Sequence, residues 1–445
     1  MAYSRFLRGA STPLTRRALA AMFAALPLAN AVEAKKPKRQ AQPEHNLRGK
    51  KAIMCVDGVT KRVPKRARKK YLKRGATRGA CQGCTPDSVA ATCAAAGICG
   101  EVLNNCGESV ACGCPSSQVC CASACAPAAW ENQTTFGTFG SGASDLDNPA
   151  AVAISPDTLT TWVADDNNDR IAVWTRPNAS STNWTNHTAF GVSGSGPGEL
   201  DGPFGVTVSL DTLTAFVADY GNNRISVWTR PTASSTAWTN TTTIGSLGSG
   251  ASQLSSPTGL AVSADALTLW IGDTNNSRIS IWTRPTASST AWSNLTTFGA
   301  SDLNYPQNIA LSPDELTLWI ADTNNNRVSI WTRPNTASTA WSNLTNFGSN
   351  GSGAGELSFP DGVAITEDTL TVWVADSNNS RISVWTRPDA TSSAWTNTTT
   401  FGSLGGGANE LYYPLSVAVS GGPTTIWIAD SANNRVSIWA AACPA

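Results

Sequence analysis

Six copies of one short motif, Asp-x-x-Asn-x-Arg, are the first candidates for chemistry in this sequence. Side-chain oxygens of Asp and Asn suit Ca²⁺, but one Asp and one Asn per copy, beside a cationic Arg, do not complete a coordination shell. Asp and Asn also close tight turns through nearby backbone groups, and Arg pairs with carboxylates. We therefore expect a structural turn in which each Arg pairs with an Asp of the same or the next copy. The residues concerned are Asp165 and Arg170, Asp219 and Arg224, Asp273 and Arg278, Asp322 and Arg327, Asp376 and Arg381, and Asp430 and Arg435.

Catalytic chemistry has few other candidates. The chain contains two histidines, His45 and His187, which excludes a metal site built from several imidazoles. A Ser-His-Asp triad would depend on His187, which stands where another copy of the repeat has Thr241. A Ca²⁺ ion bound by carboxylates is the enzymatic alternative that stays open. Because we expect no copy to break the symmetry of the repeats with unique polar residues, we predict no catalytic residue, no metal ligand and no cofactor.

The spacing of the motif indicates which elements hold it. Successive copies begin 54, 54, 49, 54 and 54 residues apart, and repeats of this length are typical of β-propellers. One copy contains four runs rich in Val, Ile, Thr and Trp, at residues 257–263, 267–273, 278–284 and 292–298, with Gly, Pro and Asn between them. Four short strands in each of six units predict six propeller blades.

The two ends of this region predict how the ring closes. Residues 130–137 (WENQTTFG) match the fourth-strand segment 395–402 (WTNTTTFG), whereas the last unit ends after its third strand at Trp439. Pairing the leftover strand with the incomplete unit removes two exposed sheet edges. The predicted fold is therefore all-β: a six-bladed propeller over 130–445, with four-stranded antiparallel blades and a ring closed by the N-terminal strand.

Several segments resemble a known repeat. Residues 321–328 (ADTNNNRV) and 375–382 (ADSNNSRI) are similar to the second half of the NHL repeat, and residues 360–365 (PDGVAI) are similar to its first half. The likeness covers all six units, which are longer than the family pattern between the third and fourth strands. The resemblance implies a six-bladed propeller that serves as a binding platform or, less often, as an enzyme.

The N-terminal part has a different composition. Residues 1–129 hold 21 of the 32 Lys and Arg but 6 of the 31 Asp and Glu, whereas residues 130–445 hold 11 Arg, no Lys and 25 acidic residues. Basic residues before an apolar run at 18–31 predict a cleaved signal peptide over 1–34, and its Arg-Arg pair resembles a bacterial twin-arginine signal. Residues 35–79 are predicted to be a disordered basic linker, either a solvated tether or a contact to anionic cell-envelope polymers.

Residues 80–129 form a predicted cysteine-rich module. Ten cysteines in so short an exported segment indicate disulfides. Zinc is the alternative, because Cys81 and Cys84 have ligand spacing, although the module has no His. The predicted disulfide residues are Cys81, Cys84, Cys93, Cys99, Cys106, Cys112, Cys114, Cys120, Cys121, Cys125 and Cys443.

Two sets of repeated residues are candidate binding surfaces. The loops from the fourth strand of one unit to the first strand of the next share a face of the propeller with the Asp-x-x-Asn turns. An acidic or amide residue in each loop would let this face attract a cation or a basic peptide; a solvated loop is the alternative. These loop residues are Asp145, Glu199, Gln253, Asp302, Glu356 and Glu410. Tryptophans of the fourth strands, at the outer rim, could stack on sugars or contact a partner: Trp130, Trp184, Trp238, Trp292, Trp341 and Trp395.

These features predict a bacterial, monomeric protein, secreted or at the cell surface, that binds a protein or glycan ligand on its propeller. The alternatives are a Ca²⁺-dependent hydrolase resembling lactonase-type propellers and a purely structural surface protein. An acidic propeller without Lys argues against nucleic acid as a partner. No segment of the mature chain is predicted to span a membrane.

We expect Cys443 to be disulfide-bonded to the N-terminal part of the chain. Eleven cysteines precede the propeller, an odd number, so complete pairing requires one bond to Cys443. Cys125, just before the closing strand, is a candidate partner. Peptide mapping of the unreduced protein checks this prediction: a cross-linked peptide containing Cys443 is the expected product, and a free Cys443 thiol would contradict it.

Overall fold

The computed structural model describes residues 51–56, 59–64, 77–78, 100–103, 109–112, 118–121, 124–127, 129–419 and 425–442 of the 445-residue chain. The predicted signal peptide, Cys443 and every cysteine side chain lie outside what is described. The segment predicted as a disordered linker contains β1 (Lys51–Val56), β2 (Val59–Pro64) and β3 (Thr77–Arg78) in one sheet. The predicted module contains the hairpin of β4 (Gly100–Leu103) and β5 (Ser109–Cys112) and that of β6 (Gln118–Cys121) and β7 (Ala124–Pro127). In the described part of the chain, no helix has the length and apolar composition needed to cross a membrane.

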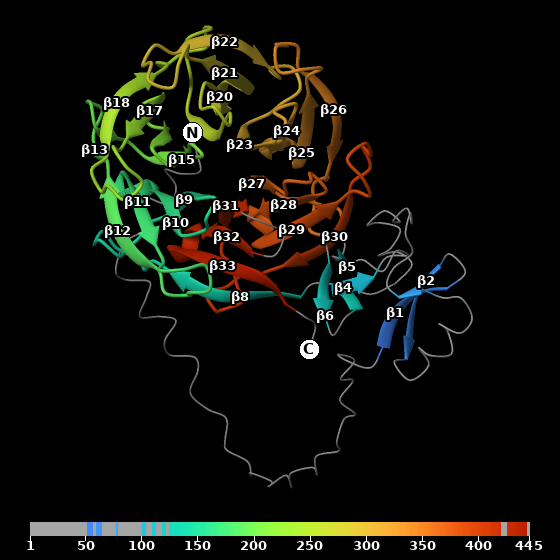
Figure 1. Ribbon diagram of the computed structural model, residues 1–445. Coiled ribbons are helices and arrows are strands. Elements are labelled where there is room, and N and C mark those ends of the chain that lie inside the picture. Colours follow the sequence, from blue (N-terminus) through green and yellow to red (C-terminus); the bar gives the residue numbers. More distant parts are fainter. Residues whose placement is uncertain are drawn as a thin grey trace.

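Six four-stranded antiparallel sheets surround a central channel and form the blades of a propeller (Figure 1). Blades 1 and 2 consist of β9 (Pro149–Ile154), β10 (Thr160–Asp165), β11 (Arg170–Thr175) and β12 (Thr185–Phe190), and of β15 (Pro203–Val208), β16 (Thr214–Asp219), β17 (Arg224–Thr229) and β18 (Thr239–Ile244). Blades 3 and 4 consist of β19 (Pro257–Val262), β20 (Thr268–Asp273), β21 (Arg278–Thr283) and β22 (Ser293–Phe298), and of β23 (Pro306–Leu311), β24 (Thr317–Asp322), β25 (Arg327–Thr332) and β26 (Ser342–Phe347). Blades 5 and 6 consist of β27 (Pro360–Ile365), β28 (Thr371–Asp376), β29 (Arg381–Thr386) and β30 (Thr396–Phe401), and of β31 (Pro414–Val419), β32 (Thr425–Asp430), β33 (Arg435–Ala442) and β8 (Ala129–Phe136).

Short elements connect the strands. A 3-10 turn joins the second and third strands in five blades: η2 (Asp166–Asn168), η3 (Thr274–Asn276), η4 (Thr323–Asn325), η5 (Ser377–Asn379) and η6 (Ser431–Asn433). In the loop leading into blade 2, β13 (Val192–Ser193) pairs in parallel with β14 (Glu199–Leu200). These turns and loops lie at the same end of each blade as the start of its inner strand, because Pro257 at the start of β19 pairs with Asp273 at the end of β20.

The ring is closed by β8, which contains the segment 130–136 of the predicted closing strand. β8 pairs with β33 in an antiparallel register that runs from Val436 opposite Phe136 to Ala442 opposite Ala129. The inner strands contact one another around the whole ring, with β31 of blade 6 packed against β9 of blade 1. The predicted six-bladed, all-β propeller closed by its N-terminal strand is thus confirmed.

Aromatic side chains fill the spaces between blades. Trp270 of blade 3 is fully buried and packs in one cluster with Trp331 and Trp341 of blade 4, and equivalent clusters occur between the other blades. Burial of one tryptophan removes about 200 Å² from water, which corresponds to roughly 5 kcal/mol of transfer free energy. Tryptophan therefore stabilises the contacts between blades.

The rim tryptophans, predicted to be partly exposed, belong to the same packing. Trp184 and Trp341 are buried, and the other four are partly buried against the core clusters. The guanidinium of Arg284 lies 4.9 Å from the ring centroid of Trp292 and 5.9 Å from that of Phe216 in the preceding blade. Four more arginines stack in this way, on Trp184, Trp238, Trp341 and Trp395. Packing and cation–π contacts therefore leave less ring surface for a sugar at the five tryptophans that carry an Arg.

The Asp-x-x-Asn-x-Arg motif forms a buried ion pair within each blade; its Asp and Arg are here named the marker Asp and the marker Arg. In blade 3, Oδ2 of Asp273 accepts a hydrogen bond from Nε of Arg278 (2.6 Å), and both Asp273 oxygens accept from Nδ2 of Asn276 (2.9 Å). The remaining nitrogens of Arg278 donate to the carbonyls of Ser249, Gly250 and Gln253 in the preceding loop. All six marker Asp side chains are fully buried and paired with the Arg of their own blade.

Arg278→Gln should lower the free energy of unfolding by about 3–5 kcal/mol, because it leaves the buried Asp273 carboxylate without its counter-ion. Urea unfolding followed by tryptophan fluorescence measures the change. The double variant Asp273→Asn/Arg278→Gln should lose less stability than Arg278→Gln alone, since it removes the uncompensated charge. Equal losses in both variants would show that the carbonyl contacts of Arg278, and not its charge, hold the blade.

Candidate functional site

The marker Asp fixes the loop that leads into the inner strand. Oδ1 of Asp273 accepts a hydrogen bond from the backbone N–H of Ser255 (2.7 Å), and the other five marker Asp residues accept an equivalent bond. The next residue, Ser256, donates its N–H to Oδ1 of Asn223 in the preceding blade (2.9 Å). The backbone at this end of the channel is therefore held by repeated contacts, whichever side chains the loop carries.

Three positions on this framework differ from blade to blade, and all three lie at the end of the channel where the inner strands begin, here named the channel mouth. Before the inner-strand proline stand Asn148, Gly202, Ser256, Tyr305, Phe359 and Tyr413. After that proline stand Ala150, Phe204, Thr258, Gln307, Asp361 and Leu415. After the marker Asp stand Asp166, Tyr220, Thr274, Thr323, Ser377 and Ser431. The repeats are uniform where they build the blades and diverse where they surround the channel.

Large aromatic residues occupy a strained backbone position at the mouth. Tyr305, Phe359 and Tyr413 have φ values of 60°, 49° and 54°, in the left-handed region that Gly202 of blade 2 adopts without a steric penalty. A residue before proline is normally extended, and a left-handed conformation costs other residues about 1–2 kcal/mol. Strain of this kind is concentrated at functional sites in proteins, where the surrounding structure enforces it.

Two tyrosines of the mouth meet although their blades are not neighbours. The hydroxyl of Tyr220 in blade 2 lies 3.4 Å from that of Tyr305 in blade 4. The ring centroid of Tyr220 is 5.7 Å from that of Phe204. Burial raises the pKa of Tyr305, and the Tyr220 hydroxyl and the charge of Asp361 add to the effect, so this phenol remains protonated.

Asp361 of blade 5 and Asp166 of blade 1 are the buried carboxyl groups among the described mouth residues, and Asp361 is the less exposed of the two. It is 2% exposed at the junction of blades 4 and 5, and its Oδ1 accepts a hydrogen bond from Nε2 of Gln307 (2.9 Å). Burial raises the pKa of Asp361 to about 7, whereas hydrogen bonds from Ser377 and Thr323 lower it. The group therefore changes its charge near neutral pH.

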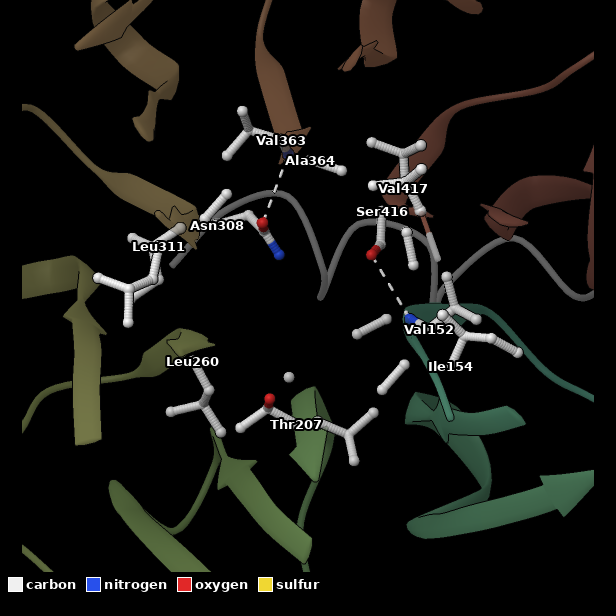
Figure 2. Close-up of a pocket in the computed structure, with 18 of the residues that line it drawn as sticks. Val152, Ile154, Thr207, Leu260, Asn308, Leu311, Val363, Ala364, Ser416 and Val417 are labelled. Atoms are coloured by element: carbon white, nitrogen blue, oxygen red, sulfur yellow. Dashed lines mark hydrogen bonds between the residues drawn. The ribbon is translucent and has the colours of Figure 1, made fainter. Parts of the chain in front are cut away.

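Below the mouth, the channel contains a cavity of about 280 Å³ lined by the inner strands (Figure 2). Most of its side chains are aliphatic, and Thr207, Asn308 and Ser416 are the polar exceptions among its lining residues. Oδ1 of Asn308 accepts a hydrogen bond from the backbone N–H of Val363 (3.3 Å), and Oγ of Ser416 accepts from that of Val152 (3.4 Å). Both side chains thus satisfy edge groups of the next blade's inner strand.

The prediction that no blade carries unique polar residues is wrong at the channel mouth. Asp361 and Gln307 follow the inner-strand proline, at a position that is Ala, Phe, Thr or Leu in the other blades. Asn308 occupies the next position, where the other blades have Gly, Ala or Ser. Aligning the six units on the inner-strand proline would have revealed these differences. The motif itself does not show them, because its positions build the framework and are uniform, whereas the neighbouring positions of each unit vary.

The acidic loop residues predicted as a binding surface lie on the same face, and several are engaged within their own loops. Side-chain oxygens of Asp145, Glu199, Gln253, Glu356 and Glu410 each accept a hydrogen bond from the backbone N–H of a glycine three residues earlier. Asp302, in the shortened loop, accepts instead from the hydroxyl of Ser301 (3.0 Å). These bonds shape the loops, and a role in binding stays a prediction. Among the described residues, no three or more His, Cys, Asp or Glu side chains lie close enough together to hold a metal ion.

Comparison with known families agrees with this architecture. Residues 254–282 and 357–385 match the NHL repeat model. The chain contains NHL repeats. Each match runs from the leucine before the inner strand to the third strand of one blade and includes the marker Asp and marker Arg, so the residues that build the framework of the NHL propeller are those that carry the match.

Several solved structures are similar to this NHL propeller. A periplasmic gluconolactonase of Pseudomonas aeruginosa is 14% identical, with a TM-score of 0.48 over 70% of this chain and 92% of that chain. A protein proposed to be a 6-phosphogluconolactonase of Bacteroides uniformis is 12% identical, with a TM-score of 0.48 over 68% and 90%. A functionally unknown protein of Desulfotomaculum acetoxidans is 16% identical, with a TM-score of 0.45 over 63% and 79%. No curated protein sequence matches the chain. At these identities the structural similarities carry no argument about activity.

Asp361→Asn should make the stability of the protein less dependent on pH. Because the folded-state pKa of Asp361 is about 7 against an ordinary 3.8, the native state keeps a proton that the unfolded state releases between these values. The resulting stability is complete below about pH 4 and is lost as the pH rises through 7. The variant should therefore gain stability relative to the unaltered protein between pH 5 and pH 8, by at most about 4 kcal/mol.

Urea unfolding at pH 5, 6, 7 and 8 measures this difference. Glu367→Gln, an exposed carboxylate in the loop at the opposite end of the inner strand, is the matched control and should leave the pH profile unchanged. An Asp361→Asn profile parallel to that of the unaltered protein would contradict a raised pKa at this position.

Proposed function

We propose that this protein is an exported or cell-surface binding protein whose NHL propeller engages its ligand at the channel mouth. The convergence of the variable positions on this one opening carries the proposal. A purely structural propeller would gain nothing from Tyr or Phe in a left-handed conformation before proline, where Gly costs less. Recognition residues, in contrast, are expected on loops that a rigid scaffold holds in place.

The ligand is proposed to be a segment of a protein partner. Five of the six rim tryptophans, which would be the natural platform for a glycan, carry a stacked arginine, and Trp130 stacks on Phe401. Aromatic side chains above a cavity, with a few polar groups in fixed positions, match the usual composition of a binding pocket. In this proposal the basic segment 35–79 holds the propeller near anionic polymers of the cell envelope.

A metal-dependent hydrolase is the second candidate, and Asp361 is the observation in its favour. A carboxyl group whose pKa lies near neutrality can act as a general acid or base. Hydrolysis assisted by Ca²⁺ would also need several oxygen ligands around one point. Among the described residues, no three or more His, Cys, Asp or Glu side chains come together to supply such a set.

Capture experiments with the full chain test the binding role. Immobilised protein, treated with an envelope extract of the producing cells, should retain a defined set of proteins. Tyr305→Ala should lose that set, because it removes the ring whose hydroxyl meets that of Tyr220 at the mouth. Tyr412→Ala, on the same loop face but 48% exposed, is the matched control and should retain it.

Three outcomes would overturn the proposal. Equal capture by Tyr305→Ala and the unaltered protein would place the ligand elsewhere. A glycan array bound in a Tyr305-dependent manner, with no protein captured, would replace the protein partner by a sugar. Stoichiometric Ca²⁺ in the purified protein, together with lactone hydrolysis that Asp361→Asn abolishes, would establish the enzyme instead.

A further inference from the structure

Among the described residues, Asp361 differs from the six marker Asp residues in having no cation paired with it. Each marker Asp is buried to the same degree and lies 2.6 or 2.7 Å from the Nε atom of its own Arg. Asp361 contacts neutral donors: the amide of Gln307 and the hydroxyls of Thr323 and Ser377. Within the described residues, no Lys, Arg or His is paired with it. A buried carboxylate without a counter-ion costs several kcal/mol, so the ionised form of Asp361 is stable only beside a cation from outside the domain.

The propeller itself has no cation to spare. Residues 130–445 contain 11 Arg and no Lys. Six pair with the marker Asp residues, and five have their guanidinium groups between aromatic rings at the rim. Against these stand 25 acidic residues, so the domain has a large negative surplus. A ligand that carries positive charge is therefore attracted to this domain, and an anionic one is repelled.

Tyrosine residues share the channel mouth with this carboxylate. Tyr305 is close enough to Asp361 for the carboxylate charge to act on its phenol, and it meets Tyr220 hydroxyl to hydroxyl. Tyr413 also acts on the phenol of Tyr305. Tyrosine faces attract alkylammonium and guanidinium groups, most strongly where water is excluded. A pair of tyrosine rings and a buried carboxylate at one end of the channel supply the two kinds of group that bind an organic cation.

We propose that the channel mouth binds a cationic group, such as the ammonium or guanidinium of a lysine or arginine side chain on a partner protein. Asp361 serves as its counter-ion, and Tyr220 and Tyr305 contact its alkyl and charged parts. This inference rests on the proposed function, since it names the chemistry that the same mouth recognises. A neutral sugar would use the rings but would leave Asp361 without a counter-ion.

Fluorine NMR of protein labelled with 3-fluorotyrosine tests the proposal directly. The chain has six tyrosines, so the spectrum is simple, and Tyr→Phe variants assign the signals of Tyr220, Tyr305 and Tyr412. The probes are n-butylammonium, n-butylguanidinium, n-butanol and butyrate. The two cations should shift the Tyr220 and Tyr305 signals in a saturable manner and leave Tyr412 in place. Butanol and butyrate should have no saturable effect.

Two matched variants separate the role of Asp361 from net charge. Asp361→Asn should weaken binding of both cations at least tenfold, whereas Glu367→Gln, which removes the same charge on the opposite face, should change it less than twofold. Binding should also weaken with acidification, by about tenfold per pH unit below 7, as Asp361 takes up a proton. The titratable groups facing Asp361 are Asp376 of its own blade and Tyr305 of blade 4, and neither gains or loses a positive charge. If Asp361→Asn does not fold, the pH series on the unaltered protein supplies the same test.

The outcomes distinguish this inference from the proposed function. Equal affinity for butanol and n-butylammonium, or undiminished cation binding by Asp361→Asn, would overturn the cationic ligand. Capture that is lost in Tyr305→Ala but kept in Asp361→Asn would retain the mouth as the binding site and reject the cation. Capture that survives Tyr305→Ala would reject the mouth itself, whatever the small cations do.

Discussion

Burial of a carboxylate is the physical constraint on which this propeller depends. Asp273 and its five equivalents end the second strands inside the protein, where an unpaired charge would cost several kcal/mol. The neutralising Arg begins the third strand, so the ion pair closes the turn between the two strands. The same Arg donates to carbonyls of the preceding loop, and the Asp accepts from that loop's backbone. One interaction, repeated six times, therefore specifies turn, loop and entrance to the channel.

A framework of this kind permits variation where the chain has least conformational freedom. Residues before the inner-strand proline adopt positive φ in every blade, from Asn148 to Tyr413, although their side chains range from Gly to Tyr. The buried ion pair and its loop contacts supply the energy that enforces this backbone on an unfavourable residue. Side chains at the mouth can consequently be chosen for what they contact, and not for the conformation they prefer.

The sequence made the framework predictable because the framework is repetitive. The spacing of the marker Asp residues predicted the six blades, and the segment 130–137 predicted the closing strand, which pairs with β33 as expected. Strand limits such as Pro257–Val262 agree with the predicted 257–263 within a residue. The mouth was not predicted, since Tyr220 and Tyr305 lie 85 residues apart and meet only through the ring geometry. Nor did composition show that Arg284 and its equivalents would cover the rim tryptophans.

The uses of arginine connect the fold with the inferred ligand. A propeller that devotes every Arg to an ion pair or an aromatic stack, and contains no Lys, has no positive group left with which to balance a further buried carboxylate. Blade 5 nevertheless places Asp361 where the other blades have neutral residues. Either this carboxyl stays protonated, at the cost of a strongly raised pKa, or a group from outside the domain neutralises it. The second state requires a cation at the mouth, and the tyrosines of blades 2 and 4 stand where such a cation would arrive. Asp361, which breaks the symmetry of the repeat, is thus also a residue whose negative charge no group of the propeller neutralises and a cationic ligand could.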